Sequence, residues 1–449
     1  MPEAVLSAYR RVMSWAPVEK DVFLYSCATI FAVANAVFAI SADYREWGQM
    51  AGVAYGVGTV VCAAVAVAAR RGDLRAATVS LVRRLVVVAL IIGAVLVPLV
   101  AELVWRADAR PGANAQSEVA VVERAGDRLA AGHSPYLSHP VTVGVSPRSD
   151  AKSIDASSFY PYLPGMVPFG LANAAAGPPE LTDARVTLAG FSLLVGALAL
   201  VVGGATVGRR GRVLQFLVVL PSGALPIVTG GDDLPVLALM LAGLVLAAKR
   251  RPVLAGLVLG AAATLKFTAW PVIVLMLLAI RDREGRPALL RYSGAVCLVV
   301  VPVIGIGFAT SPVAFVLNVI KFPLGLTSVK SPAASPLLGQ VLVSIFPDHK
   351  RLIIAVLALV GFGLVAYGLR RFTPRTPAAV VRFTAWAMLL ATLLAPATRF
   401  GYLMYPANLF VWAYLLDGMV PTPLPSPAEE IAVPPGAVLD LGPATAVPG

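Results

Sequence analysis

SEVAVVERAGDRLAAGHSPY, residues 117–136, lies in the longest polar gap of a chain that is otherwise strongly apolar. With Ser117 as N-cap and about 100° of rotation per residue, this segment predicts an amphipathic helix. The apolar face of that helix carries one acid, Glu118, together with Val122, Ala125 and Leu129. A carboxylate directed at the surface on which the helix packs needs either a partner or a chemical task.

The opposite face of the predicted helix is charged and carries Glu123, Arg124, Asp127 and Arg128. Because its acids have arginines beside them, we interpret this face as solvated. Glu118 itself has two explanations. It is either a functional carboxylate or an acid near a helix N-terminus, where the helix dipole stabilises it by less than about 1 kcal/mol.

The composition indicates a polytopic membrane protein. Hydrophobic residues make up 58% of the chain and charged residues 13%, whereas a soluble domain has about 25% charged residues. The net charge of +12 could point to nucleic acid, but the basic residues are spread over short loops between apolar runs. The positive-inside rule explains that distribution better, so no nucleic-acid partner is expected.

Apolar runs predict an all-α transmembrane bundle with about twelve passes of roughly 20 residues when regular. The first three runs begin near Val22, Met50 and Leu85, and the third ends at Trp105. The others cover residues 186–207, 213–228, 234–248, 253–265, 268–280, 293–308, 352–369, 379–395 and 402–416.

Basic clusters orient this bundle. If the N-terminus is cytoplasmic, the clusters at 70–84, 209–212, 249–251, 281–291 and 370–382 all face the cytoplasm. Both termini are then cytoplasmic in a multi-pass protein of the cell membrane. The long gap and a second gap later in the chain lie on the extracytoplasmic side.

We therefore divide the chain into six parts. They are the N-terminal segment with three membrane helices (1–105), an extracytoplasmic catalytic loop (106–185), central membrane helices (186–309), a second extracytoplasmic loop (310–351), C-terminal membrane helices (352–416) and a disordered Pro- and Ala-rich cytoplasmic tail (417–449).

Two runs, 253–265 and 268–280, are too short to cross about 30 Å as straight helices. They form either a half-depth hairpin or a thinned or broken part of the bundle, with Lys266 at its outer tip. An ionisable residue between half-length apolar runs usually marks function. The alternative is a lysine that extends its ammonium group to the interface.

Other polar candidates lie at predicted outer ends. Asp232 and Asp233 begin a helix and either bind hydroxyl groups of a ligand, assist a cation or cap the helix. Arg399, in PATRFGYLMYP at 396–406, either binds phosphate or anchors the last helix at the interface. Lys330 lies in a Pro- and Ser-rich part of the second loop, which either covers the site or is a solvated loop.

The three histidines and three cysteines form no pattern typical of zinc binding or of a disulfide framework. No cofactor is indicated, and the sequence leaves open whether a divalent cation assists the reaction. The oligomeric state is equally open.

The polar gap continues with a helix stop at Gly132, Pro135 and Tyr136, followed by FYPYLP at residues 159–164. This order of features resembles the first outer loop of GT-C glycosyltransferases. That loop has an acid, then a helix of small residues, then Gly-x-x-Pro-Tyr and then an aromatic Tyr-x-Pro element. The closest resemblance is to glycosyltransferase family 87, which uses polyprenol-phosphate-mannose.

Two later segments, GGDDLPVLALMLAGLVLA (230–247) and AGLVLGAAATLKFTAWP (255–271), also resemble segments of that family. The resemblance covers roughly residues 117–414. It departs from the family in having glutamate where aspartate is usual, and about two extra passes before the loop.

This resemblance implies an inverting transfer of a hexose, with mannose the first expectation, from a polyprenyl phosphate to a lipid or glycan acceptor on the outer side. Glu118 is then the general base, a role worth typically about 10²- to 10⁴-fold in rate. Lys266 and Arg399 bind the donor phosphate. Tyr136, Tyr160 and Tyr162, with Asp232, Asp233 and Lys330, contact the substrates.

The main alternative is a transporter or lipid flippase, because about twelve passes with short helices also suit that class. Against it, one outer loop of about 80 residues holds most of the polar groups, whereas a transporter built from repeats has two similar halves. A membrane scaffold is a third class, but it leaves the acid on the apolar face of the loop helix unexplained.

Overall fold

The computed structural model describes residues 14–108, 115–138, 158–324, 326–327, 329 and 333–419. Over these residues the chain is helical, and the only β-type pairing in them is an isolated bridge between Ala334 and Thr398. Eight of the described helices are long and apolar enough to cross a membrane. The predicted all-α polytopic class is therefore confirmed.

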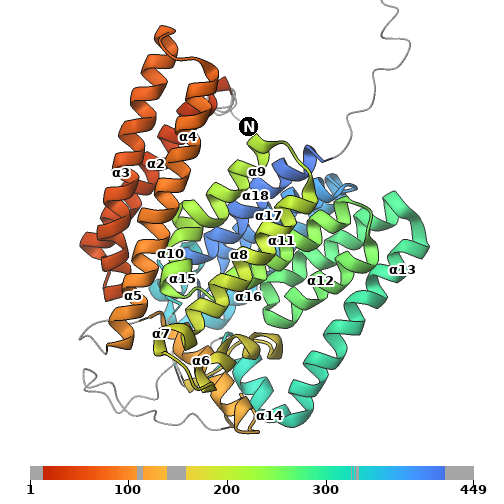
Figure 1. Cartoon of the computed structure of the whole chain (residues 1–449). Coiled ribbons are helices and arrows are strands. Elements are labelled where there is room, and N and C mark those ends of the chain that lie inside the picture. Colours follow the sequence, from red (N-terminus) through yellow and green to blue (C-terminus); the bar gives the residue numbers. More distant parts are fainter. Residues whose placement is uncertain are drawn as a thin grey trace, which may run out of the picture.

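The first helices form an N-terminal unit, which stands to one side of the bundle in Figure 1. It consists of α2 (Pro17–Phe38), α3 (Ala42–Arg71), α4 (Ala76–Ile91), the π-helix η1 (Ile92–Leu96) and α5 (Val97–Ala107). Helices α2 and α3 pack closely because Gly48 lets the backbones meet; a Cβ atom there would lie 2.5 Å from the Ala32 carbonyl oxygen. Tyr55 ties the unit to the core by donating to the Val219 carbonyl oxygen at 2.5 Å.

The polar gap folds over one end of the bundle, the lower end in Figure 1. Its elements are α6 (Ser117–Ala130), the 3₁₀-helix η3 (Pro164–Ala174) and α7 (Pro179–Thr182). The predicted loop helix is therefore present, although its cap position is Gln116 and not Ser117. Helices α6 and η3 touch backbone to backbone at Gly126 and Gly170, where a Cβ on Gly170 would lie 1.9 Å from the Val122 carbonyl oxygen.

The central helices follow the predicted apolar runs. They are α8 (Ala184–Gly203), α9 (Val207–Leu214), η4 (Gln215–Val219), α10 (Pro221–Thr229), α11 (Leu234–Ala248) and α12 (Pro252–Leu265). Most side chains of α11 are buried, because protein packs around this helix on nearly every side. With 14 residues, α12 is about 21 Å long and shorter than a bilayer core.

Helix α13 (Trp270–Thr310) contains a reversal of the chain. Gly285 has φ 78°, and the Tyr292 hydroxyl donates to the Ile273 carbonyl oxygen at 3.1 Å. In a straight helix those residues would be about 28 Å apart. The two halves of α13 are therefore antiparallel and correspond to the separate runs predicted at 268–280 and 293–308.

Eight further helical elements follow α13 in the described part of the chain. They are α14 (Pro312–Phe315), η6 (Val316–Lys321), α15 (Leu338–Ile345), η7 (Pro347–His349), α16 (Lys350–Arg371), α17 (Pro377–Leu394), η8 (Phe400–Leu403) and α18 (Met404–Asp417). Lys330 and the predicted tail beyond Met419 lie outside the described residues.

Candidate active site

Glu118 has a cationic partner from the far end of the sequence. Arg399 lies in extended backbone just before η8, and its Nη1 donates to Glu118 Oε1. The other carboxylate oxygen accepts from Ser117 Oγ at 2.9 Å. Because the Glu118 side chain is only 14% exposed, this contact supplies the partner that a carboxylate on a packed face requires.

Two backbone features hold Glu118 in place. The Gln116 amide donates to the Thr229 carbonyl oxygen at 3.0 Å, so the start of α6 is attached to the end of α10. Gly230 follows with φ 92°, and a Cβ atom there would lie 2.1 Å from the Val119 side chain. A glycine is therefore required at this crossing, both for its left-handed backbone and for its lack of a side chain.

A second ion-pair cluster lies at the same end of the bundle. Lys266, in extended backbone at the end of α12, places Nζ 2.7 Å from Asp232 Oδ1 and 2.6 Å from Asp233 Oδ1. Both acids come from the turn that precedes α11. Asp232 Oδ2 is buried and has no hydrogen-bond partner among the described residues.

The two clusters influence each other electrostatically. Burial raises the pKa of Asp232 to about 6; Lys266 opposes the shift, while Asp233 and Glu118 add to it. Burial alone would lower the pKa of Lys266, but the charges of Asp232 and Asp233 outweigh burial and hold that pKa above its usual value. Likewise, Glu118 helps to raise the pKa of Arg399 against the effect of burial. The two cations are therefore protonated at neutral pH.

Residues from three further elements complete the Lys266 cluster. Tyr405, in the first turn of α18, donates to Asp233 Oδ1 at 2.7 Å, and the Thr268 hydroxyl is 2.8 Å from the Tyr405 hydroxyl. The Tyr162 ring lies 5.0 Å from Lys266 Nζ, close enough for a cation–π contact. Sequence reasoning missed the roles of Thr268 and Tyr405, although Tyr405 lies in the same short segment as Arg399.

The other two predicted substrate tyrosines lie behind Tyr162. Tyr136 and Tyr160 are each 2% exposed, with ring centroids 5.5 Å apart, and Tyr160 packs edge-on against Tyr162 at 5.3 Å. The Tyr136 hydroxyl donates to the Tyr162 carbonyl oxygen at 3.0 Å. These two rings support the Tyr162 segment, which the Leu163 amide also ties to the Leu265 carbonyl oxygen at 3.1 Å.

The site thus joins a carboxylate, two cations, two further acids and aromatic side chains at one end of a helical membrane bundle. The model of glycosyltransferase family 87 matches residues 162–396, just over half of the 449 residues. The chain belongs to glycosyltransferase family 87. It is accordingly a membrane glycosyltransferase with a GT-C type helical architecture.

The family 87 match contains the Lys266 cluster but not the whole site. It includes Tyr162, Asp232, Asp233 and Lys266, begins after Glu118 and ends before Arg399. The Glu118–Arg399 pair therefore rests on the geometry described above. No curated protein and no solved structure matches the chain.

On the face of α6 that we predicted to be solvated, Glu123 is buried in this family 87 protein, while Arg124, Asp127 and Arg128 are half-buried. Glu123 is 6% exposed and pairs with Arg106, Oε2 to Nη2 at 2.6 Å and Oε1 to Nη1 at 2.8 Å. The Ala184 amide, at the start of α8, also donates to Glu123 Oε1 at 3.1 Å. The solvated interpretation of Glu123 was wrong because α5 and α8 supply its partners from distant parts of the sequence.

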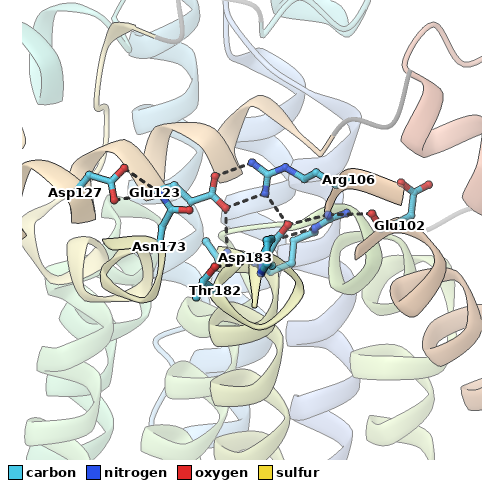
Figure 2. A network of polar contacts seen from close by, with 10 residues as sticks. Glu102, Arg106, Glu123, Asp127, Asn173, Thr182 and Asp183 are labelled. Carbon is cyan, nitrogen blue, oxygen red and sulfur yellow. Dashed lines mark hydrogen bonds and ion pairs between the residues drawn. The ribbon is translucent and has the colours of Figure 1, made fainter. Parts of the chain in front are cut away.

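Arg106 and Arg185 share Asp183, which extends this network (Figure 2). Arg106 Nη1 lies 2.5 Å from Asp183 Oδ2, and Arg185 Nη2 lies 2.8 Å from the same oxygen. Burial raises the pKa of Asp183, but hydrogen bonds and charge from Arg185, together with Arg106, outweigh burial and leave the pKa below its usual value. The network joins the N-terminal unit, the loop helix α6 and α8.

Among the described residues, no group of three or more His, Cys, Asp or Glu side chains has an arrangement that could hold a metal ion. The three cysteines are unpaired, and only Cys62 is buried.

Proposed function

We propose that this family 87 glycosyltransferase moves a hexose, with mannose the first expectation, from a polyprenyl phosphate to a hydroxyl of a lipid or glycan acceptor. The transfer inverts the anomeric centre and takes place at the extracytoplasmic face of the cell membrane. The observation that carries this proposal is the convergence of Glu118, Arg399 and Lys266 at the α6 end of the bundle.

Glu118 is the general base of the proposed reaction. It accepts the proton of the acceptor hydroxyl as that oxygen bonds to C1 of the sugar and the bond from C1 to the phosphate oxygen breaks. The electron pair of that bond leaves with the polyprenyl phosphate, which gains one negative charge. Lys266 and Arg399 stabilise this charge, since preorganised cations act most strongly where charge develops.

Each of these cations is paired with a carboxylate of the protein itself. A donor phosphate that contacts Arg399 competes with Glu118 for the guanidinium. Glu118 Oε1 then becomes available to the acceptor hydroxyl. Donor binding and activation of the base are therefore coupled in this mechanism.

Asp232 supplies a contact for the donor sugar. Its Oδ2 atom is buried, has no hydrogen-bond partner in the part of the chain that the structure describes, and belongs to the side chain that pairs with Lys266. Such an oxygen favours a hydroxyl donor from the ligand, because a buried acceptor without a hydrogen bond costs about 1–3 kcal/mol. Asp233 keeps Lys266 oriented, and Tyr405 in turn orients Asp233.

The distribution of basic residues supports an extracytoplasmic site. Arg70 and Arg71 end α3, Arg370 and Arg371 end α16, and the turn within α13 contains Arg281 and Arg283. The positive-inside rule assigns these clusters to the cytoplasm. One apolar span, α4 through α5, leads from the cluster at Arg71 to the segment that contains α6. This supports assigning α6 to the opposite face of the membrane.

Sugar transfer in membranes that express the chain tests this function. The donor is radiolabelled polyprenyl-phosphate-mannose, the acceptor is a native lipid extract, and Glu118→Gln is assayed in parallel. We expect a labelled product that falls by about 10²- to 10⁴-fold in the variant while the folded yield is unchanged. Retained turnover in Glu118→Gln would reject the base, and absence of product with every polyprenyl-linked sugar would favour a flippase.

A further inference from the structure

A cavity lies on the side of α6 that faces away from Glu118. Its volume is about 170 Å³, and it is formed where α5, α6, η3 and α7 meet. Its lining mixes the charged and polar side chains of Arg106, Glu123, Asn173, Thr182 and Asp183 with the apolar side chains of Leu103, Ala107 and Pro179. We call this cavity the Arg106 cavity. Figure 2 shows the polar side chains of its lining.

The charges of the Arg106 cavity are already matched. Arg106 pairs with both Glu123 and Asp183, and Asp183 also pairs with Arg185. A free anion would meet the carboxylates of Glu123 and Asp183 here, and a free cation would meet the Arg106 guanidinium, while the buried Arg185 balances the second carboxylate from behind the lining. The arrangement therefore favours an uncharged ligand.

Hydrogen-bonding capacity remains for such a ligand. Asn173 donates from its Nδ2 group to Asp127 at 2.9 Å, and its Oδ1 is an acceptor that this contact does not use. The Thr182 hydroxyl makes one long contact, 3.4 Å to the Pro179 carbonyl oxygen, and can still accept a hydrogen bond. Leu103, Ala107 and Pro179 add apolar surface to the same lining.

The size and place of the cavity fit one sugar ring of a longer glycan. It is smaller than the roughly 300–1,000 Å³ of sites that enclose drug-sized ligands. Glu123 in its wall follows Glu118 by five residues on α6, about 7–8 Å along the helix axis. Because the cavity lies on the other side of α6, whose diameter with side chains is about 10–12 Å, only an acceptor of several sugars, passing around the helix, contacts both places while its reacting hydroxyl lies at Glu118.

We propose that the Arg106 cavity binds a sugar ring of the acceptor, remote from the hydroxyl that reacts. This inference rests on the proposed function for the identity of the ligand as acceptor. The cavity itself is built from residues that do not take part in the chemical step. It also gives the N-terminal unit a role in substrate selection, since α5 forms one of its walls.

Binding of a neutral probe tests the cavity without any transfer reaction. Methyl α-mannoside is titrated by ligand-observed NMR against the full-length protein in nanodiscs, up to about 10 mM, a range that detects weak binding. Ala107→Phe fills the cavity, whereas Val104→Phe adds the same ring at an exposed position on α5. We expect Ala107→Phe to weaken binding at least about tenfold and Val104→Phe to leave it unchanged.

A second variant with a smaller change in volume tests the cavity if Ala107→Phe does not fold. Thr182→Val keeps the shape of the side chain and removes its hydroxyl, and we expect it to weaken probe binding by about threefold. Equal binding by the wild type and the folded cavity variants would overturn the proposal, as would absence of probe binding to the wild type.

Acceptor titration in the transfer assay separates this proposal from the proposed function. If the cavity holds acceptor, Ala107→Phe raises the amount of lipid extract needed for half-maximal rate and leaves the donor KM and the maximal rate near their wild-type values. If Ala107→Phe needs the same amount of lipid extract for half-maximal rate as the wild type, the cavity does not bind the acceptor, although the proposed transfer reaction is unaffected. If the wild type transfers no sugar but probe binding responds to Ala107→Phe, the proposed function fails and the sugar site remains.

Discussion

Arg399 Nη1 donates a hydrogen bond to Glu118 Oε1, although 281 positions separate the two residues in the sequence. The contact joins the segment before the last helix to the first turn of the loop helix α6. The proposed base and one proposed phosphate ligand are therefore direct partners before any substrate binds.

Replacing Arg399 by Gln tests whether this arginine binds the donor. The variant removes a cation that would make charge-assisted hydrogen bonds to phosphate, worth about 1.5–3 kcal/mol. We expect the donor KM to rise by about 10- to 100-fold, with Arg399→Lys intermediate because it keeps the charge. Steady-state kinetics with varied donor measure this effect. An unchanged donor KM with a lowered rate would mean that Arg399 only positions Glu118.

A pair of variants separates the structural role of Lys266 from its proposed binding of the donor phosphate. Lys266→Met leaves Asp232 and Asp233 without their shared cation, and breaking such a buried pair costs about 3–5 kcal/mol of stability. Adding Asp233→Asn removes one of the unpaired charges and should restore part of the thermal stability. Donor affinity should remain low in both variants. Recovery of donor affinity in the double variant would exclude phosphate binding by Lys266.

Much of the fold was predictable because membrane helices are encoded locally. Apolar runs gave the positions of the helices, and the short runs beside Lys266 became α12 and the first half of α13. The cluster RDREGR at 281–286 marked the turn between the halves of α13 as a basic loop. Hydrophobicity and charge act over a few residues, so the sequence carries this information directly.

The partners within the site were not predictable in the same way. Glu118, Lys266 and Arg399 were each chosen for an unusual local setting, but spacing alone cannot show that Arg399 contacts Glu118 while Lys266 contacts Asp232 and Asp233. For Glu123, the local sequence led to a wrong prediction. Its neighbours in sequence made it resemble a solvated acid, and only the tertiary approach of Arg106 and α8 buried it.

Donor affinity should depend on pH through Asp232. Its pKa of about 6 means that the carboxyl group is neutral below that pH and charged above it. Loss of this negative charge beside Lys266 favours an anionic donor, so the donor KM should fall by up to about tenfold as the pH decreases from about 7.5 to 5.5. Kinetics across this range measure the effect. Asp232→Asn should show a flat profile, and a matching slope in that variant would assign the titration to another group.

The contact between α6 and η3 should not tolerate a side chain. A Cβ atom at Gly170 would lie 1.9 Å from the Val122 carbonyl oxygen, so Gly170→Ala must separate the two backbones. We expect a loss of about 1–3 kcal/mol in stability, the usual cost of overpacking. Gly190→Ala is the matched control, because nothing lies within 4 Å of that position in α8. Thermal unfolding in detergent compares the two, and equal melting temperatures would show that the contact is looser than described.

Glu123→Gln tests whether the Arg106 network positions Glu118 as well as stabilising the fold. A matched control exists in α2, far from the site. Asp21 is 1% exposed and also pairs with two arginines, Arg83 at 2.5 Å and Arg212 at 3.0 Å. Asp21→Asn therefore removes a comparable buried charge, and both variants should melt at lower temperature.

Only Glu123→Gln should also change catalysis, because Glu123 lies on the helix that carries the base. A displacement of about 1 Å at a reacting group can cost about 10²-fold in rate. We therefore expect kcat per folded molecule to fall by up to about 10²-fold in Glu123→Gln and by less than about twofold in Asp21→Asn. If both variants lose the same activity per folded molecule, the network contributes to stability alone, and α6 must be positioned by its backbone contacts with α10 and η3.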